Sequence, residues 1–92
     1  MDSLVVDQTL DVQGLMCPMP LVKARNTLMQ MEIGRVLKVM ATDRGSLKDF
    51  QGWAKTARNV ELLSQSEEKV NGKTVLVHFV RRTKYSSYII IS

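Results

Sequence analysis

The fold of this chain is decided by the stretch Leu10-Asp11-Val12-Gln13-Gly14-Leu15-Met16-Cys17-Pro18-Met19-Pro20, which predicts a strand end, a turn and a helix start. Gly14 marks the turn. Each proline fixes its own φ and disfavours the helical conformation in the residue before it, so we expect Cys17 and Met19 to be non-helical. Pro20 suits the first helical position, where its missing N–H costs nothing. The stretch therefore predicts a stiff leader that holds one sulfur at the start of a helix.

Cys17 is the only cysteine of the chain and its best candidate for chemistry. A lone cysteine in a cytosolic protein is most often a small buried hydrophobe. This one, however, lies between a strand end and a helix start, at an edge where open α/β sheets bind ligands. A helix N-terminus stabilises a thiolate through its dipole and its unpaired N–H groups, here those of Leu21 and Val22. We therefore expect the pKa of Cys17 to lie below the model-peptide value of about 8.5.

The periodicity of apolar residues predicts four strands and two helices. The strands are expected at residues 10–12, 36–41, 60–66 and 73–81, and the helices at 20–31 and 47–58. Asn71-Gly72, between the last two strands, is a strong signal for a β-hairpin. In the order βαβαββ, right-handed crossovers place both helices on one face of a four-stranded mixed sheet. The predicted fold is thus an α/β (α+β) two-layer sandwich.

Two further positions suggest local roles. Ser46 and Asp49 have the spacing of a capping box at the start of the second helix. His78, the only histidine, lies on the last strand, and we expect it on the polar or half-exposed face of the sheet with no link to Cys17. A Cys/His metal site needs at least three ligands, and the chain has one cysteine and one histidine. Because the glycine motifs that bind phosphates and dinucleotides are also missing, we expect no metal and no cofactor.

The composition is that of one ordinary globular domain, with 92 residues, 45% of them hydrophobic and 24% charged. We expect this domain to span residues 1–82, followed by a tail at 83–92 that is either an extra edge strand or a disordered end. One cysteine cannot form an internal disulfide, and the N-terminus lacks the basic region of a signal peptide. No apolar run approaches the roughly 20 residues that span a bilayer. These features predict a cytoplasmic protein.

A net charge of +4 and an isoelectric point of about 9.5 suggest a polyanionic partner such as RNA, or an acidic protein surface. The basic residues are scattered, however, except in Arg81-Arg82-Thr83-Lys84 at the end of the last strand. Aromatic residues are too few, and too poorly interleaved with basic ones, for a base-stacking platform. The pattern therefore favours an averagely basic small domain over a nucleic-acid-binding protein.

Residues 10–20 resemble the L-D-x-x-G-x-x-C-P-x-P signature of the TusA/SirA-like sulfur-carrier family. The signature is specific because it fixes a strand end, a glycine turn and two prolines at set spacings. The βαβαββ fold that the resemblance implies agrees with the element order predicted from periodicity. The similarity covers roughly residues 8–82 and continues through Gly34, the turn at 43–46, Lys48-Asp49 and Trp53.

The resemblance implies a sulfur relay. The cysteine of this family accepts a sulfane sulfur from a donor persulfide and passes it to the cysteine of another protein. Here that role falls on Cys17, framed by Gly14, Pro18 and Pro20. The implied partners are a donor of the sulfurtransferase or cysteine-desulfurase type and a cysteine-bearing acceptor, without membrane or nucleic acid. The carrier is expected to be a monomer, with or without a sulfurtransferase activity of its own.

Two positions depart from the tRNA-thiolation member of the family. Met19 stands where that member has an acidic residue, and Lys48 where it has an arginine. The resemblance therefore does not select among tRNA thiolation, sulfur oxidation, molybdenum-cofactor supply and selenium metabolism. Two other classes of function remain open at this point. One is a basic nucleic-acid-binding or regulatory module in which Cys17 is incidental, and the other is a redox sensor in which Cys17 is oxidised and then reduced again.

Overall fold

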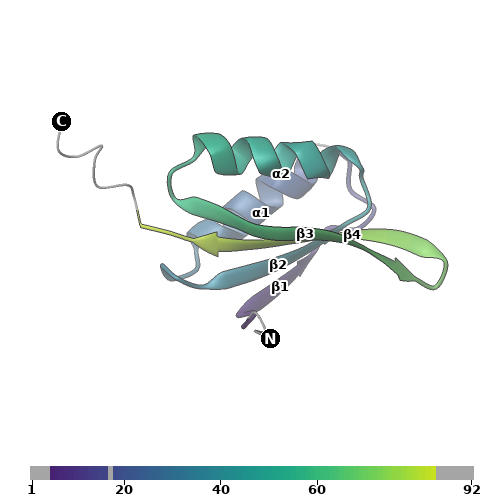
Figure 1. Ribbon diagram of the computed structural model, residues 1–92, viewed down its shortest axis with the longest axis horizontal. Helices are drawn as coiled ribbons and strands as arrows, with labels where there is room; N and C mark the ends of the chain where they lie inside the picture. The colour runs from purple at the N-terminus through teal and green to yellow at the C-terminus, as the bar shows by residue number, and fades with distance from the viewer. Residues whose placement is uncertain (1–4, 17, 85–92) are drawn as a thin grey trace.

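The computed structural model describes residues 5–16 and 18–84 (Figure 1). Its strands are β1 (Gln8–Asp11), β2 (Val36–Ala41), β3 (Val60–Val70) and β4 (Lys73–Arg82), and its helices are α1 (Met19–Met29) and α2 (Gly45–Thr56). The predicted βαβαββ order is therefore confirmed over the described residues. Cys17 lies outside the described residues. Residues 85–92, most of the predicted tail, lie outside them as well.

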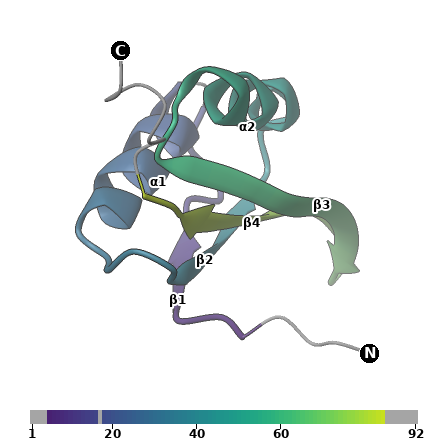
Figure 2. The same cartoon turned by 60° about the vertical axis from the view of Figure 1, so that its left-hand side comes forward.

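The strands form one mixed sheet in the order β1-β2-β4-β3. β1 and β2 are parallel, whereas β4 runs antiparallel to both β2 and β3. Both helices lie on the same face of this sheet (Figure 1, Figure 2). Because the apolar stripe of each helix needs an apolar surface to cover, the helices and the sheet pack as two layers. The predicted two-layer sandwich is thus confirmed.

The hydrophobic core fills the space between the helices and the sheet. Ala24 and Leu28, four residues apart on α1, and Phe50 of α2 are fully buried there. They pack with Leu37 and Val39, which β2 directs toward the helices. Burying a side chain of the size of leucine or phenylalanine stabilises a fold by about 1.5–3 kcal/mol. This packing fixes both helices on the sheet and thereby fixes where their N-termini lie.

The β3–β4 hairpin extends past the helices (Figure 1). Its turn, Asn71-Gly72, confirms the predicted hairpin and has positive φ at both residues, 51° and 78°, as a two-residue turn of type I′ requires. β3 is longer than the predicted 60–66, because residues 67–70 continue to pair with β4. Their side chains are exposed and carry no apolar alternation, so the sequence gives no signal for this part of the strand. Backbone pairing holds it instead of burial.

The start of α2 differs from the predicted capping box. α2 begins at Gly45 rather than at residue 47, and Ser46 lies inside its first turn with 1% of its surface exposed. The first N–H groups of the helix bond to Asp43, whose carboxylate accepts from Gly45 at 3.3 Å and whose carbonyl oxygen accepts from Ser46 at 3.0 Å. The capping-box prediction for Ser46 and Asp49 is wrong, because the Ser46 hydroxyl bonds to a buried residue of the sheet.

Candidate functional site

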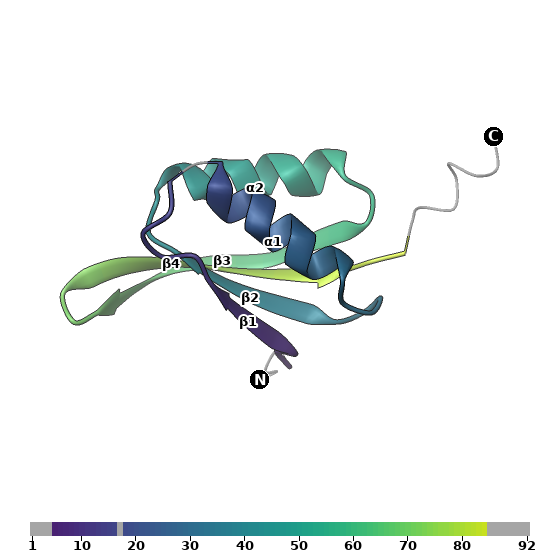
Figure 3. The ribbon, with the colours of Figure 1, turned by 180° about the vertical axis from the view of Figure 1, so that it is seen from behind.

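The loops that follow β1 and β2 meet at one edge of the sheet. Because these strands are parallel and each is followed by a helix, the N-termini of α1 and α2 both lie at this edge (Figure 3). The N–H of Gly14 donates a hydrogen bond to Oγ1 of Thr42 at 2.9 Å, which ties the first loop to the second. Gly14 has a φ of +87°, a conformation that residues with a Cβ rarely adopt. The leader that contains Cys17 therefore starts from an anchored glycine turn.

The first turn of α1 grows out of a tight local turn. The N–H of Met19 donates to the carbonyl oxygen of Met16 at 2.9 Å. α1 therefore begins at Met19, with Pro18 at its N-cap and the buried Pro20 in second position. The prediction of a non-helical Met19 followed by Pro20 as first helical residue is wrong, because the bond to Met16 draws Met19 into the helix. Proline is tolerated in second position, since an N–H there has no acceptor within the helix.

These bonds change which N–H groups the first turn can offer to the thiol. Pro18 and Pro20 have no backbone N–H, and the N–H of Met19 already donates to Met16. The N–H of Val22 donates to the carbonyl oxygen of Pro18 at 3.1 Å, so the prediction that Val22 supplies a free N–H is wrong. Leu21 provides the remaining amide of the turn. Cys17 lies outside the described residues, and its activation by Leu21 and by the helix dipole stays a prediction.

His78 is fully buried, not half-exposed as predicted. Its ring stacks on that of Phe50 with the two centroids 4.2 Å apart. Alternate residues of a strand share a face, and His78 shares the helix-facing side of β4 with Leu76 and Val80, which are also buried. Val75 and Val77, on the other face of β4, are buried too, so the largely apolar run 75–80 is the signal in the sequence for a buried ring. Burial lowers the pKa of His78 to about 4, so the imidazole is neutral at pH 7.

The neighbours of His78 fix which ring nitrogen carries the proton. The amide nitrogen of Gln65 donates to the carbonyl oxygen of Leu47 at 3.0 Å, and a carbonyl oxygen only accepts, so the orientation of this amide is settled. The same nitrogen donates to Nδ1 of His78 at 3.0 Å. The proton is therefore on Nε2, which donates to Oγ of Ser46 at 3.0 Å. These contacts give His78 a structural role that joins α2 to β3 and β4.

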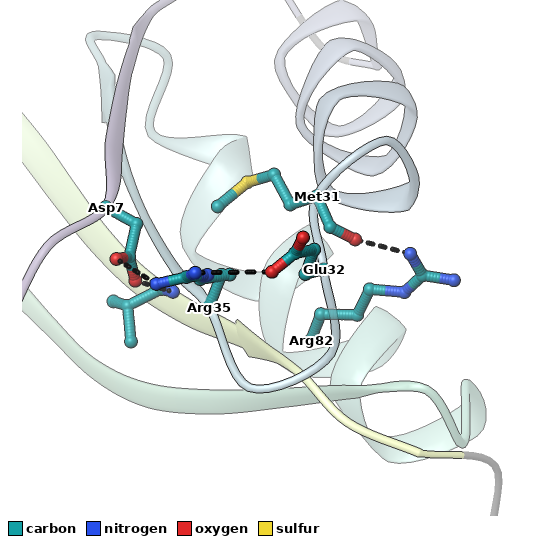
Figure 4. A network of polar contacts seen from close by, with 6 residues as sticks. Asp7, Met31, Glu32, Arg35 and Arg82 are labelled. Carbon is teal, nitrogen blue, oxygen red and sulfur yellow. Dashed lines mark hydrogen bonds and ion pairs between the residues drawn. The ribbon is translucent and has the colours of Figure 1, made fainter.

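The basic run at the end of β4 is engaged in the fold. At the C-terminal end of α1, the guanidinium of Arg82 donates to the carbonyl oxygen of Met29 at 3.1 Å. It also donates to the carbonyl oxygen of Met31 (Figure 4). A cation at this end of a helix is stabilising because it faces the negative end of the dipole. Arg81 forms an ion pair with Glu61 of β3. Two of the three cations in this run are thus engaged within the fold, which weakens the nucleic-acid-binding alternative.

A shallow cavity lies at the opposite edge of the sheet, lined by residues 7–8, 30–32 and 35. Arg35 pairs there with Glu32 at 3.2 Å and with Asp7 at 3.3 Å, and both carboxylates raise the pKa of its guanidinium (Figure 4). The second oxygen of Asp7 accepts the N–H of Val36 at 2.8 Å. These groups bond to one another and hold the start of β1 against β2, so we assign this cavity no function.

Neither described helix is long and apolar enough to cross a membrane. Within residues 5–16 and 18–84, no group of three or more His, Cys, Asp and Glu side chains is placed to hold a metal ion. The candidate site therefore consists of the leader and of the two loops that anchor it.

Known proteins resemble the chain over most of its length. The family model described as Sulfurtransferase TusA matches residues 8–86. A putative sulfur carrier protein of Halobacterium salinarum is 44% identical over 79 residues, which cover 86% of this chain and 93% of that protein. The sulfur carrier protein TusA of Allochromatium vinosum is 52% identical over 62 residues, which cover 67% of this chain and 80% of that protein.

A solved structure has the same fold. The SirA-like protein from Desulfitobacterium hafniense superimposes with a TM-score of 0.59 and covers 79% of this chain and 95% of its own. Its sequence identity is 23%, so the likeness concerns the fold alone. The family match and the identities to sulfur carrier proteins confirm the family predicted from the sequence. The chain belongs to the TusA sulfurtransferase family.

Proposed function

We propose that this chain is a sulfur carrier in which Cys17 holds a sulfane sulfur as a persulfide and passes it to the cysteine of an acceptor protein. The observation that carries the proposal is the family match over residues 8–86, a range that includes the only thiol of the chain. Relatives matched over much of that range bear the name sulfur carrier protein. A thiolate is the nucleophile that attacks a persulfide, and Cys17 is the residue of this sequence that forms one.

The proposed transfer uses only thiols and persulfides. The Cys17 thiolate attacks the outer sulfur of the donor persulfide, a bond forms between Sγ and that sulfur, and the S–S bond of the donor breaks. The outer sulfur keeps its proton, and the donor leaves as a thiolate. A thiolate of the acceptor later attacks the same outer sulfur and releases Cys17 as a thiolate. Each step exchanges one S–S bond for another, so no external oxidant, reductant or cofactor is consumed.

The described ends of the leader support repeated exchange. On one side Gly14 is bonded to Thr42, and on the other the buried Pro20 joins the leader to α1. Pro18, at the N-cap, restricts the backbone between them. We propose that Gly14, Pro18 and Pro20 hold the thiol in position. A second cysteine on the same chain would attack the persulfide and displace its outer sulfur, and the sequence contains none.

Sulfur carriers of this family interact with a sulfur donor and a sulfur acceptor. For this chain we propose a donor of the sulfurtransferase or cysteine-desulfurase type and an acceptor with a reactive cysteine. The chain would act as a monomer in the cytoplasm, where thiols stay reduced, without binding nucleic acid or a membrane. Residues 1–82 would form the carrier domain, and residues 83–92 would be an appended tail.

Mass spectrometry of the intact protein tests the proposal. Incubation with a persulfidated donor should add the mass of one sulfur atom, which a reductant removes and prior alkylation prevents. Cys17→Ser should remain folded, because the described core does not use the thiol, and should gain no mass. If several competent donors leave the wild-type mass unchanged, or if Cys17→Ser gains the same mass, the proposed function is wrong.

A further inference from the structure

Three exposed apolar residues flank Cys17 in the sequence. Met16 is 74% exposed and Met19 is 42% exposed, and Pro18 between them is exposed as well. The 2.9 Å hydrogen bond from the Met19 N–H to the Met16 carbonyl oxygen holds these residues in one tight turn. Met16, Pro18 and Met19 are called the methionine turn below. It lies at the edge of the sheet where the two helices begin.

The other exposed large apolar residues of the described chain are placed differently. Val5 and Ile33 lie at the opposite edge, before β1 and before β2, and Val70 lies at the tip of the β3–β4 hairpin. A single exposed apolar side chain is ordinary on a protein surface, whereas a group of them marks a contact site. Burying a methionine against a partner removes apolar surface from water and is favourable. The methionine turn therefore offers a partner binding energy that the isolated chain does not use.

We infer that the methionine turn is the surface on which the donor and the acceptor proteins dock, an inference that rests on the proposed function. A carrier must present the same sulfur to two different proteins, one after the other. Methionine suits this task because its unbranched, polarizable side chain adapts to apolar surfaces of different shape. The backbone bond between Met16 and Met19 keeps the two residues in one turn, and each side chain can repack against a new partner.

Exposed basic residues of this chain lie near the methionine turn and indicate which charges a partner surface should carry. Lys23 lies four residues after Met19, hence on the same face of α1, and is exposed. The first turn of α1 contains no acidic residue that would offset this charge or the positive end of the helix dipole. The methionine turn thus has an apolar centre with a cation one helical turn away.

The start of α2 adds to this charge. Arg44 and Lys48, four residues apart, are exposed at the same edge. Arg44 pairs with Glu67 at 3.3 Å, and the nearby carboxylates of Asp43 and Asp49 are only partly exposed. Lys48 and Lys23 are therefore exposed cations at this edge, where the exposed carboxylate of Asp11 already accepts the N–H of Gln13 at 3.0 Å. The partner surface that complements it has an apolar centre rimmed by carboxylates.

The first experiment compares two sulfur donors. A persulfidated sulfurtransferase or cysteine desulfurase that loads wild-type Cys17 has to dock, whereas glutathione persulfide is too small to need a docking surface. In the double variant Met16→Ser/Met19→Ser, KM for the protein donor should rise by about tenfold or more at similar kcat. A tenfold change corresponds to about 1.4 kcal/mol, less than the burial of one methionine. The rate with glutathione persulfide should stay unchanged.

An apolar control variant and a matched pair of charge variants complete this experiment. Val5→Ser/Ile33→Ser removes apolar side chains that are 74% and 57% exposed, both at the opposite edge, and should leave both rates unchanged. Lys23→Glu should slow transfer from the protein donor and weaken its dependence on salt. Arg25→Glu makes the same change of charge on another face of α1, because residues two apart do not share a face, and should have little effect.

Each outcome bears on one claim. Unchanged KM in the methionine variant would overturn the inference while leaving the proposed function intact, provided that the protein donor loads wild-type Cys17. An equal fall in the transfer rate with both donors would also overturn the inference, because the turn would then act on the reactivity of the thiol and not on docking. If neither donor loads the wild-type protein, the proposed function itself fails. Thermal unfolding of each variant, expected to match wild type because the substituted side chains are exposed, excludes a folding defect.

Discussion

The backbone N–H of Gly14 donates a hydrogen bond to Oγ1 of Thr42 at 2.9 Å, and this bond joins the two loops from which the candidate site is built. Thr42→Val removes the acceptor with little change in shape and should lower the free energy of unfolding by about 1 kcal/mol. Thr42→Ser keeps the hydroxyl and should retain most of that stability. Urea titrations of the three proteins measure the difference. Equal midpoints for Thr42→Val and wild type would show that the bond contributes nothing.

The buried ring of His78 makes the stability of the fold depend on pH. Its pKa is lowered to about 4 in the folded protein, whereas an unfolded chain has the ordinary value of about 6.5. Between these values the unfolded state binds a proton that the folded state does not. The free energy of unfolding should therefore be unaffected above about pH 6.5 and fall by roughly 3 kcal/mol on acidification toward pH 4. Chemical denaturation across this range measures the loss.

The variant His78→Gln is the control for this effect, because its amide can still bond to Ser46 and Gln65 but does not titrate. Carboxylates that protonate over the same range contribute to both proteins and cancel in the comparison. Wild type should lose more stability than His78→Gln on acidification. A parallel loss in the two proteins would mean that another group titrates. Nitrogen chemical shifts of the ring should independently show the proton on Nε2 at neutral pH.

Arg82 and Arg81 are adjacent, but their substitution should have different consequences. Arg82→Met keeps an aliphatic stem and removes the donors to the carbonyl oxygens of Met29 and Met31, which should cost about 1.5–3 kcal/mol. Arg81→Met removes an exposed ion pair with Glu61 and should cost less than about 1 kcal/mol. Thermal unfolding compares the two variants. Similar losses would contradict the assignment of Arg82 as the residue that stabilises the end of α1.

The order of elements was predictable because its signals are local. The apolar spacing of α1 and the Asn71-Gly72 turn are each contained within a few residues, and each describes the structure correctly. The far end of β3 was not predictable in this way. Its exposed residues 67–70 are held by pairing with β4. Neither the strand propensity of these residues nor a pattern of buried positions predicts that pairing.

Long-range contacts explain the errors around the site. The capping-box prediction failed because Ser46 bonds to His78, 32 positions away, and local spacing does not reveal such a partner. The exposure of His78 was misjudged for a related reason, since the polar groups that satisfy its ring come from α2 and β3. The start of α1 was misplaced by one residue because the bond to Met16 outweighed the preference of a residue before proline. The motif around Cys17 is contained within residues 10–20 and needs no distant contact to be recognised, and the role of Cys17 stays a prediction.

The most direct test of the carrier account follows one labelled sulfur from donor to acceptor. A donor persulfidated with radiolabelled sulfur is mixed with the chain and removed, and the loaded chain is then added to a reduced acceptor protein. Label should reach Cys17 first and then appear on the acceptor cysteine while an equal amount leaves Cys17, and Cys17→Ser should abolish the transfer. Label that stays on Cys17, or that reaches the acceptor equally well through Cys17→Ser, would contradict the account.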